Sequence, residues 1–167
     1  MALSLNVIAD IFLLQFANHV FYDGGKKLAV IAFVLGAVVL GLVVILIPTP
    51  VLIGGIPLQG YIDMFQMIWF AQALFTFLTG IIITLAAFKS ATKGETLVEK
   101  RGMQLLGMLG ISLALTNIMF ILDEFSTVEF GGNFSLFYYL GWIIAHIGII
   151  CAYLGFILPG WLKKRWE

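Results

Sequence analysis

Hydrophobic residues occur in long uninterrupted runs along this chain, and short polar segments separate the runs. Residues 28–47 form 20 consecutive positions without a polar side chain. A helix rises about 1.5 Å per residue, so this run covers about 30 Å, the thickness of the hydrocarbon core of a bilayer. Three further runs, at residues 61–88, 103–122 and 136–162, are also long enough to span. The pattern predicts an all-α integral membrane protein with four transmembrane helices.

The first 25 residues differ from these runs because polar and apolar side chains alternate in them. Polar residues that interrupt the apolar ones include Asp10, Gln15, Asn18, His19 and Asp23. We therefore predict an N-terminal interfacial amphipathic helix over residues 1–25, followed by a four-helix transmembrane bundle over residues 26–167. The alternative is a fifth span with an exterior N-terminus.

The distribution of charge predicts the orientation of the chain. All nine basic residues fall on one side of the predicted membrane, and Lys and Arg near span ends are retained on the cytoplasmic side. The sequence thus predicts a multi-pass protein with cytoplasmic N- and C-termini. The basic residues are Lys26, Lys27, Lys89, Lys93, Lys100, Arg101, Lys163, Lys164 and Arg165.

The opposite side contains acidic residues and no basic ones. This outer acidic cluster consists of Asp63, Asp123, Glu124 and Glu129. Four negative charges at one surface can concentrate cations or pair with a basic partner. Simple solvation of acidic loop residues accounts for the same cluster.

Polar side chains also occur deep within the predicted spans. Counting residues from the outer span ends places Gln72, Ser112 and His146 about 15 Å deep. Thr76 lies one turn from Gln72, and Thr116 one turn from Ser112, so each pair shares a helix face. These five residues predict a mid-membrane polar layer that faces the bundle interior. Hydrogen bonding between neighbouring helices is the competing explanation for them.

The fourth predicted span has two distinctive faces. A seam of small residues allows close approach of another helix, either within the bundle or between subunits. A second face carries aromatic residues beside His146 and is a candidate contact for a ligand, a quinone or another subunit. The seam consists of Gly141, Ala145, Gly148, Ala152 and Gly155, and the aromatic contact face of Tyr139, Trp142 and Tyr153.

The loop between the first two spans is unusually apolar. Residues 48–60, PTPVLIGGIPLQG, contain three prolines, three glycines and no charge. We predict that this loop docks in the outer interface or against another subunit. A re-entrant segment that lines a cavity is the alternative, since irregular backbone is tolerated there.

A repeated spacing of 74 positions suggests two duplicated helical hairpins. It relates Lys26-Lys27 to Lys100-Arg101, and it relates Gln72 to His146. Repeats of this kind are frequent in transport proteins. Four evenly spaced spans with basic cytoplasmic ends produce the same offsets without duplication.

Composition excludes most soluble activities. Hydrophobic residues make up 62% of the chain and charged residues 11%, whereas soluble domains contain about 25% charged residues. No phosphate-binding glycine motif, Cys/His metal cluster or catalytic set occurs, and the basic residues are explained by topology rather than by nucleic-acid binding. No cofactor is assigned: His19 and His146 lie at different depths, which argues against a haem held by both.

These observations predict a small structural or accessory subunit of a larger membrane complex or homo-oligomer. Its partners are the lipid bilayer and other membrane subunits or copies of itself, which bind apolar helix faces and the loop at residues 48–60. A small transporter or channel for protons or cations through the polar layer is one alternative. A quinone-binding or redox-cofactor-binding membrane subunit is another.

Overall fold

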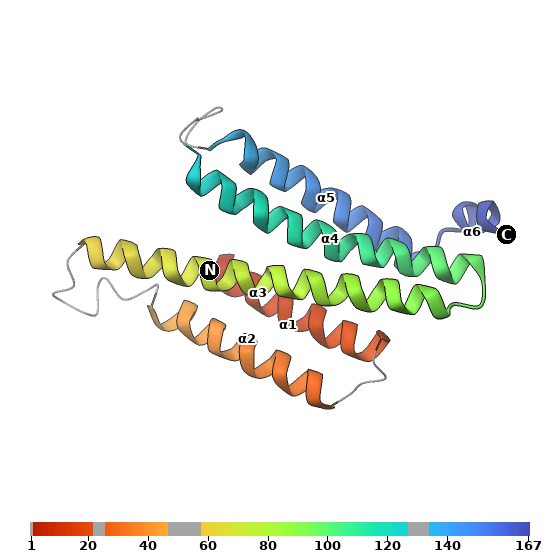
Figure 1. Cartoon of the computed structure of the whole chain (residues 1–167), viewed down its shortest axis with the longest axis horizontal. Helices are drawn as coiled ribbons and strands as arrows, with labels where there is room; N and C mark the ends of the chain where they lie inside the picture. Colours follow the sequence, from red (N-terminus) through yellow and green to blue (C-terminus); the bar gives the residue numbers. More distant parts are fainter. Residues whose placement is uncertain (1, 22–25, 47–57, 127–133) are drawn as a thin grey trace. The chain divides into compact units, whose positions relative to one another are not determined.

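The computed structural model describes residues 2–21, 26–46, 58–126 and 134–167 (Figure 1). Every regular element within these ranges is a helix, which confirms the all-α prediction. Two compact units divide the chain, Met1–Thr76 and Phe77–Glu167, and one helix runs from the first into the second. The helices are α1 (Ala2–Phe21), α2 (Lys26–Leu46), α3 (Leu58–Lys93), α4 (Leu97–Phe125), α5 (Leu136–Ile157) and α6 (Gly160–Trp166).

Three of the described helices, α3, α4 and α5, are long and apolar enough to cross a membrane. This finding supports the predicted membrane protein, and the three helices coincide with three of the four predicted spans. The remaining predicted span, residues 28–47, coincides with α2, whose described apolar stretch is Ala29–Val44. A stretch of similar length, Leu5–Phe21, lies in α1.

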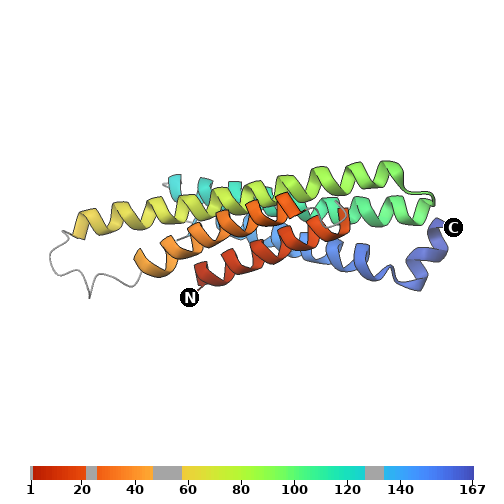
Figure 2. The same cartoon turned by 90° about the horizontal axis from the view of Figure 1, so that it is seen from below.

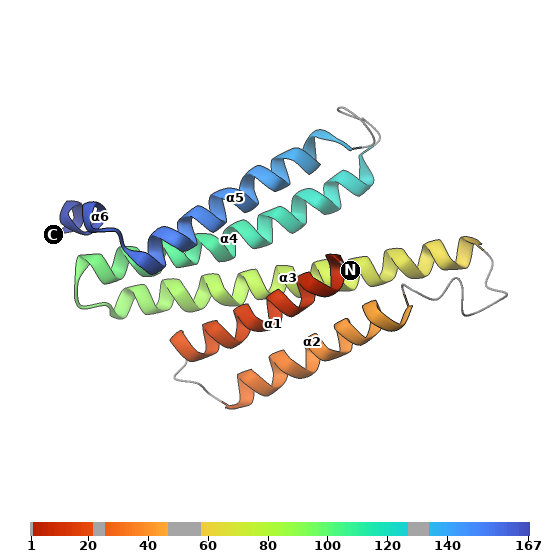
Figure 3. The same ribbon diagram turned by 180° about the vertical axis from the view of Figure 1, so that it is seen from behind.

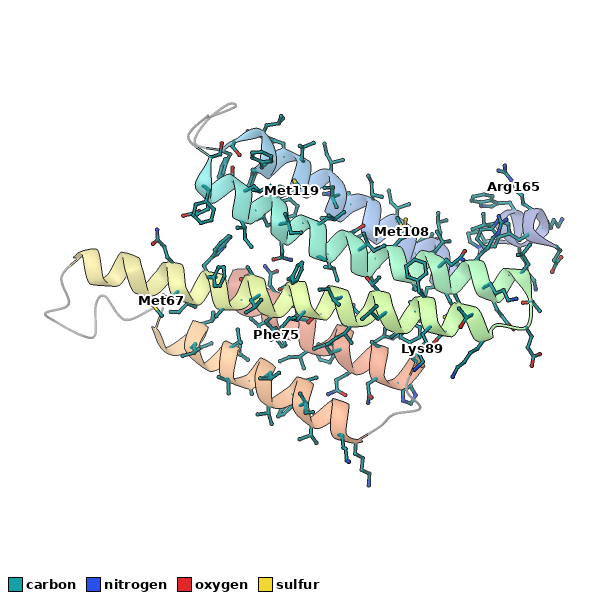
Figure 4. All side chains as sticks on the ribbon, in the orientation of Figure 1. Met67, Phe75, Lys89, Met108, Met119 and Arg165 are labelled. Atoms are coloured by element: carbon teal, nitrogen blue, oxygen red, sulfur yellow. The ribbon has the colours of Figure 1, made fainter. Side chains whose placement is uncertain are left out.

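In the first unit, α1 and α2 run antiparallel and side by side (Figures 1 and 3). Nε2 of Gln15 donates a hydrogen bond of 3.1 Å to the carbonyl oxygen of Ala29 and so joins the two helices. Gly36 of α2 faces Ile11 and Phe75, because a Cβ there would lie 2.3 Å from Cγ1 of Ile11 and 3.4 Å from Cζ of Phe75. Phe75 extends from the middle of α3 (Figure 4). Because Gly36 has no side chain, Ile11 of α1 and Phe75 of α3 can both pack against α2 at this position.

The orientation of α1 differs from that of an interfacial helix. Asp10 and Asn18 are each 3% exposed, whereas Leu5 and Phe12 are 65% and 70% exposed. An interfacial helix turns its polar face to water and its apolar face to the acyl chains. In α1, Asp10 and Asn18 are sheltered by protein while Leu5 and Phe12 point outward, as in a helix surrounded by lipid. The predicted interfacial location is therefore not confirmed.

In the second unit, α4 and α5 pack as an antiparallel pair (Figures 1 and 2). Gly141, Gly148 and Gly155 are buried at intervals of seven residues. A Cβ at Gly148 would lie 2.5 Å from Cβ of Ser112, and a Cβ at Gly155 would lie 2.9 Å from the carbonyl oxygen of Gly102. The small-residue seam of α5 is therefore in contact with α4 of the same chain.

The C-terminal half of α3 approaches α4 just as closely, at a pair of glycines. A Cβ on Gly110 would lie 2.4 Å from the carbonyl oxygen of Gly80, and a Cβ on Gly80 would lie 2.6 Å from that of Gly110. The hydroxyl of Thr84 is 2.8 Å from the carbonyl oxygen of Gly80 and 3.4 Å from that of Gly107. Main chains in such contact are typical of small residues at membrane helix crossings. α4 thus presents small residues to α3 and to α5.

A capping box determines where α4 begins. Oγ1 of Thr96 accepts a hydrogen bond of 3.2 Å from the backbone N–H of Glu99, and Oε2 of Glu99 accepts one of 3.3 Å from the N–H of Thr96. This reciprocal arrangement satisfies two of the N–H groups that a helix start leaves unpaired. α4 can therefore start at Leu97, and three residues separate it from the end of α3 at Lys93.

α5 ends at Ile157, five residues before the predicted end of the fourth span. Pro159 has no N–H to donate and its ring clashes with a preceding helical turn, so the helix cannot continue through it. Leu158 takes a left-handed conformation with φ of 44°. The following α6 carries Arg165 on its surface (Figure 4). The guanidinium of Arg101, in α4, lies 5.6 Å from the ring centroid of Trp166 in α6.

Candidate functional site

A buried carboxyl in α1 is hydrogen bonded to α3. Oγ1 of Thr76 donates to Oδ2 of Asp10, and the same hydroxyl lies 3.2 Å from the main-chain carbonyl oxygen of Gln72. Asp10, Gln72 and Thr76 are 3%, 6% and 8% exposed. Gln72 and Thr76 share a face of α3 because they are four residues apart. Thr76 of the predicted polar layer is thus bonded to an acid that the sequence pattern placed at the membrane surface.

Charged groups are scarce around this carboxyl. Asp10 forms no ion pair with any described residue. The ion pair found among the described residues joins Lys163 to Glu167, at the other end of the chain. Lys26 and Lys27 are exposed at the start of α2. Among the described residues, the Asp10 carboxyl is therefore bonded to a hydroxyl and is not paired with a countercharge.

A second buried polar group lies further along α1. The side chain of Asn18 is 3% exposed, and its Oδ1 has no hydrogen-bond partner among the described residues. Asn18 is eight residues after Asp10, which corresponds to about 12 Å along the helix axis. Buried acceptors are usually paired with protein or with water, so an unpaired one indicates a place where a small donor is accommodated.

Ser112 and Thr116, the α4 members of the predicted polar layer, lie in the contact with α5. Both are buried, at 5% and 7% exposure. Oγ1 of Thr116 donates a hydrogen bond of 3.3 Å to the carbonyl oxygen of Gly141, and Cβ of Ser112 lies against Gly148. Their role in the structure is contact between two helices, the competing explanation given for these residues.

His146 lies on the outward face of α5 and is exposed. In a helix of 3.6 residues per turn, this position is nearly opposite Gly141 and Gly148, which face α4. The structure therefore does not bring His146 together with Ser112 and Thr116. Nδ1 of His146 is 2.7 Å from the carbonyl oxygen of Trp142. A carbonyl can only accept, so Nδ1 carries the proton and Nε2 of the neutral ring is an acceptor.

Large side chains accompany His146 along α5 at alternating intervals of three and four residues. We call this row the outward seam. Such spacing repeats every seven residues and is typical of helices that pack against a partner helix. All six residues of the seam are exposed: Tyr139 (41%), Trp142 (47%), His146, Ile149 (62%), Tyr153 (57%) and Phe156 (65%).

Aromatic rings continue from the outward seam onto the end of α4. Tyr138 stacks on Phe134 with ring centroids 4.1 Å apart. Phe120 of α4 lies 5.8 Å from both Tyr138 and Trp142, in tilted and edge-on arrangements. Tilted and edge-on ring pairs are favourable geometries. This cluster holds Trp142 in place at one end of the seam.

The predicted outer acidic cluster is described only in part. Oδ1 of Asp123 accepts a hydrogen bond of 2.7 Å from the backbone N–H of Ser135, so this carboxylate connects the end of α4 to the start of α5. Glu124 is exposed. The side chain of Asp63 and all of Glu129 lie outside the described residues, as does most of the loop at residues 48–60.

Sequence reasoning missed two features that a simple signal could have revealed. Asp10 and Asn18 are polar side chains within the mainly apolar α1, the same signal that indicated inward faces at Gln72 and Ser112. Gly80 and Gly110 lie in long apolar runs, where isolated glycines favour close contact between helices.

The described residues therefore offer two candidate sites, the buried Asp10–Thr76 pair and the outward seam of α5. No group of three or more His, Cys, Asp or Glu side chains within the described ranges could hold a metal ion. Cys151 is a free, half-buried thiol. Comparison of the chain with models of protein families, with curated proteins and with solved structures finds no match.

Proposed function

We propose that this protein is a subunit of a membrane assembly and binds a partner helix through the outward seam of α5. The observation that carries the proposal is the outward position of His146. This residue lies ten positions after Leu136, at a depth of about 15 Å if α5 spans the bilayer from its first residue. Ionisable side chains at such depth almost always face protein or a water-filled cavity.

The composition of the seam supports a helical partner. Its side chains recur at the spacing of a coiled-coil contact, and the opposite face of α5 is already occupied by α4 through Gly141, Gly148 and Gly155. The Nε2 acceptor of His146 matches a hydroxyl, amide or indole donor on a partner helix. Another subunit and a second copy of this chain both satisfy these requirements.

The orientation that we propose follows the basic residues. All nine lie at the start of α2, at the end of α3, at the start of α4 or in α6, which supports a cytoplasmic location for these parts. The sheltered position of Asp10 and Asn18 supports a crossing of the membrane by α1 as well. The proposed topology accordingly has five spans, an exterior N-terminus and a cytoplasmic C-terminus.

The test is purification of the tagged full chain from its native membranes in a mild detergent, followed by native mass spectrometry. The variants are His146→Leu in the seam and Ile147→Ala as a control, since Ile147 is 49% exposed but points to a different side of α5. We expect wild type and the control to co-purify with a partner or as an oligomer, and His146→Leu to lose most of that association. Wild-type particles with a single chain, or full association of His146→Leu, would overturn the proposal.

A quinol is the second candidate occupant of the same face. The specific observation is the hydrogen bond from Nδ1 of His146 to the carbonyl oxygen of Trp142, which leaves Nε2 free to accept from a quinol hydroxyl. The flanking rings of Trp142 and Tyr153 supply aromatic surface. Organic extraction of the purified protein tests this candidate, which predicts a quinone that is depleted in His146→Leu; an extract without quinone excludes it.

A further inference from the structure

We propose that Asp10 and Thr76 form a proton-binding site inside the first unit, in which the carboxyl of Asp10 takes up and releases a proton. The site is independent of the outward seam on α5. It is built from two helices, because Asp10 belongs to α1 and Thr76 to α3. Both side chains are more than nine-tenths buried and are joined by a hydrogen bond.

The described residues around Asp10 include no charge that could balance a carboxylate. On α1 the next titratable group is His19, which is exposed and nine residues away. α2 has no charged residue after Lys27, and α3 has none from residue 64 to residue 88. Burial of an unpaired carboxylate is strongly unfavourable, and such a group instead takes up a proton. The described residues offer no additional ligands for a metal ion at this position.

The hydroxyl of Thr76 can form a hydrogen bond with Asp10 whether the carboxyl is ionised or protonated. When Asp10 is ionised, Thr76 donates its single proton to Oδ2. When Asp10 is protonated, its O–H donates to the Thr76 oxygen, and Thr76 turns its own proton toward the carbonyl oxygen of Gln72 at 3.2 Å. Serine and threonine hydroxyls can donate and accept at the same time. The hydrogen bond between Oδ2 of Asp10 and Thr76 can therefore persist when the carboxyl gains or loses a proton.

Infrared difference spectroscopy of the full chain in lipid nanodiscs tests the site. Ordinary carboxylic acids are ionised at pH values above about 5. We expect a protonated-carboxyl band in the wild type that persists above this pH, disappears reversibly as the pH is raised, and is absent in Asp10→Asn. Asp123→Asn is the matched control, because it removes a carboxyl that is not fully buried, and it should retain the band.

Two further variants keep the result interpretable. Thr76→Val removes the hydroxyl at nearly constant volume and should shift the frequency of the band, whereas Thr76→Ser should leave it in place. Circular dichroism and gel filtration establish that each variant is folded, and the contrast between Thr76→Val and Thr76→Ser carries the test if Asp10→Asn does not fold. A wild type without a protonated-carboxyl band above about pH 5, or a band that does not respond to pH or to Thr76→Val, would overturn the proposal.

Discussion

Replacement of Gly110 by alanine should destabilise the second unit more than any ordinary glycine-to-alanine change. The added methyl group would lie 2.4 Å from the carbonyl oxygen of Gly80 and 2.7 Å from the backbone nitrogen of Thr84. Both of these atoms belong to the main chain of α3. They can move away only if the whole helix moves, so the clash cannot be relieved by a change of rotamer.

Two opposing terms set the size of the effect. Overpacking of a close contact costs about 1–3 kcal/mol, and the upper end applies here because the partners are backbone atoms. Alanine is favoured over glycine within a helix by about 1 kcal/mol. The net loss is therefore about 2 kcal/mol, which corresponds to a roughly 30-fold shift of the unfolding equilibrium.

The assay is unfolding of the purified protein in mixed micelles with increasing dodecyl sulfate, followed by circular dichroism. Gly41→Ala in α2 is the matched control, since a Cβ at Gly41 meets no atom within 4 Å. We expect the control to unfold with the wild type or later, and Gly110→Ala to unfold at a clearly lower detergent fraction. If Gly110→Ala and Gly41→Ala gave superimposable curves, the close contact of α3 with α4 would be refuted.

Two further predictions concern the ends of α4. Thr96→Ala removes the capping box with Glu99 and should cost about 1 kcal/mol in the same unfolding assay, while Thr96→Ser should stay near the wild type. Asp123→Ala leaves the backbone N–H of Ser135 without its acceptor and should cost about 1.5–3 kcal/mol, as expected for a hydrogen bond to a charged group. Asp123→Asn keeps an oxygen in place and should recover most of that loss; equal losses for the two substitutions would show that this hydrogen bond is not the cause.

The sequence was sufficient to predict where apolar helices lie, because length and hydrophobicity determine this directly. It was less informative about which side of each helix faces protein. Counting residues gives the depth of His146 but not its direction. The direction follows from Gly141 and Gly148. The face of α5 that carries these small residues packs against α4, so His146 points to the opposite side.

The candidate site at Asp10 shows a different limit of sequence reasoning. A polar stripe on α1 fits both a helix at the water interface and a helix that shelters polar groups in protein. The burial of Asp10 and its hydrogen bond from Thr76, 66 positions away in the chain, distinguish the two arrangements. The end of α5 was visible in the sequence at Pro159, but the apolar residues around it extended the predicted span to Leu162.

The three-residue connection between α3 and α4 bears on how the protein is made. During synthesis, α4 leaves the ribosome directly after α3. The turn at residues 94–96 is too short to let the two helices move far apart. The capping box forms from residues within the turn and the first turn of α4, so it needs no later part of the chain. α3 and α4 can therefore leave the insertion machinery as a finished pair, with Gly80 against Gly110, before α5 has been synthesised. The surface against which the glycines of α5 pack is then already in place when that helix arrives.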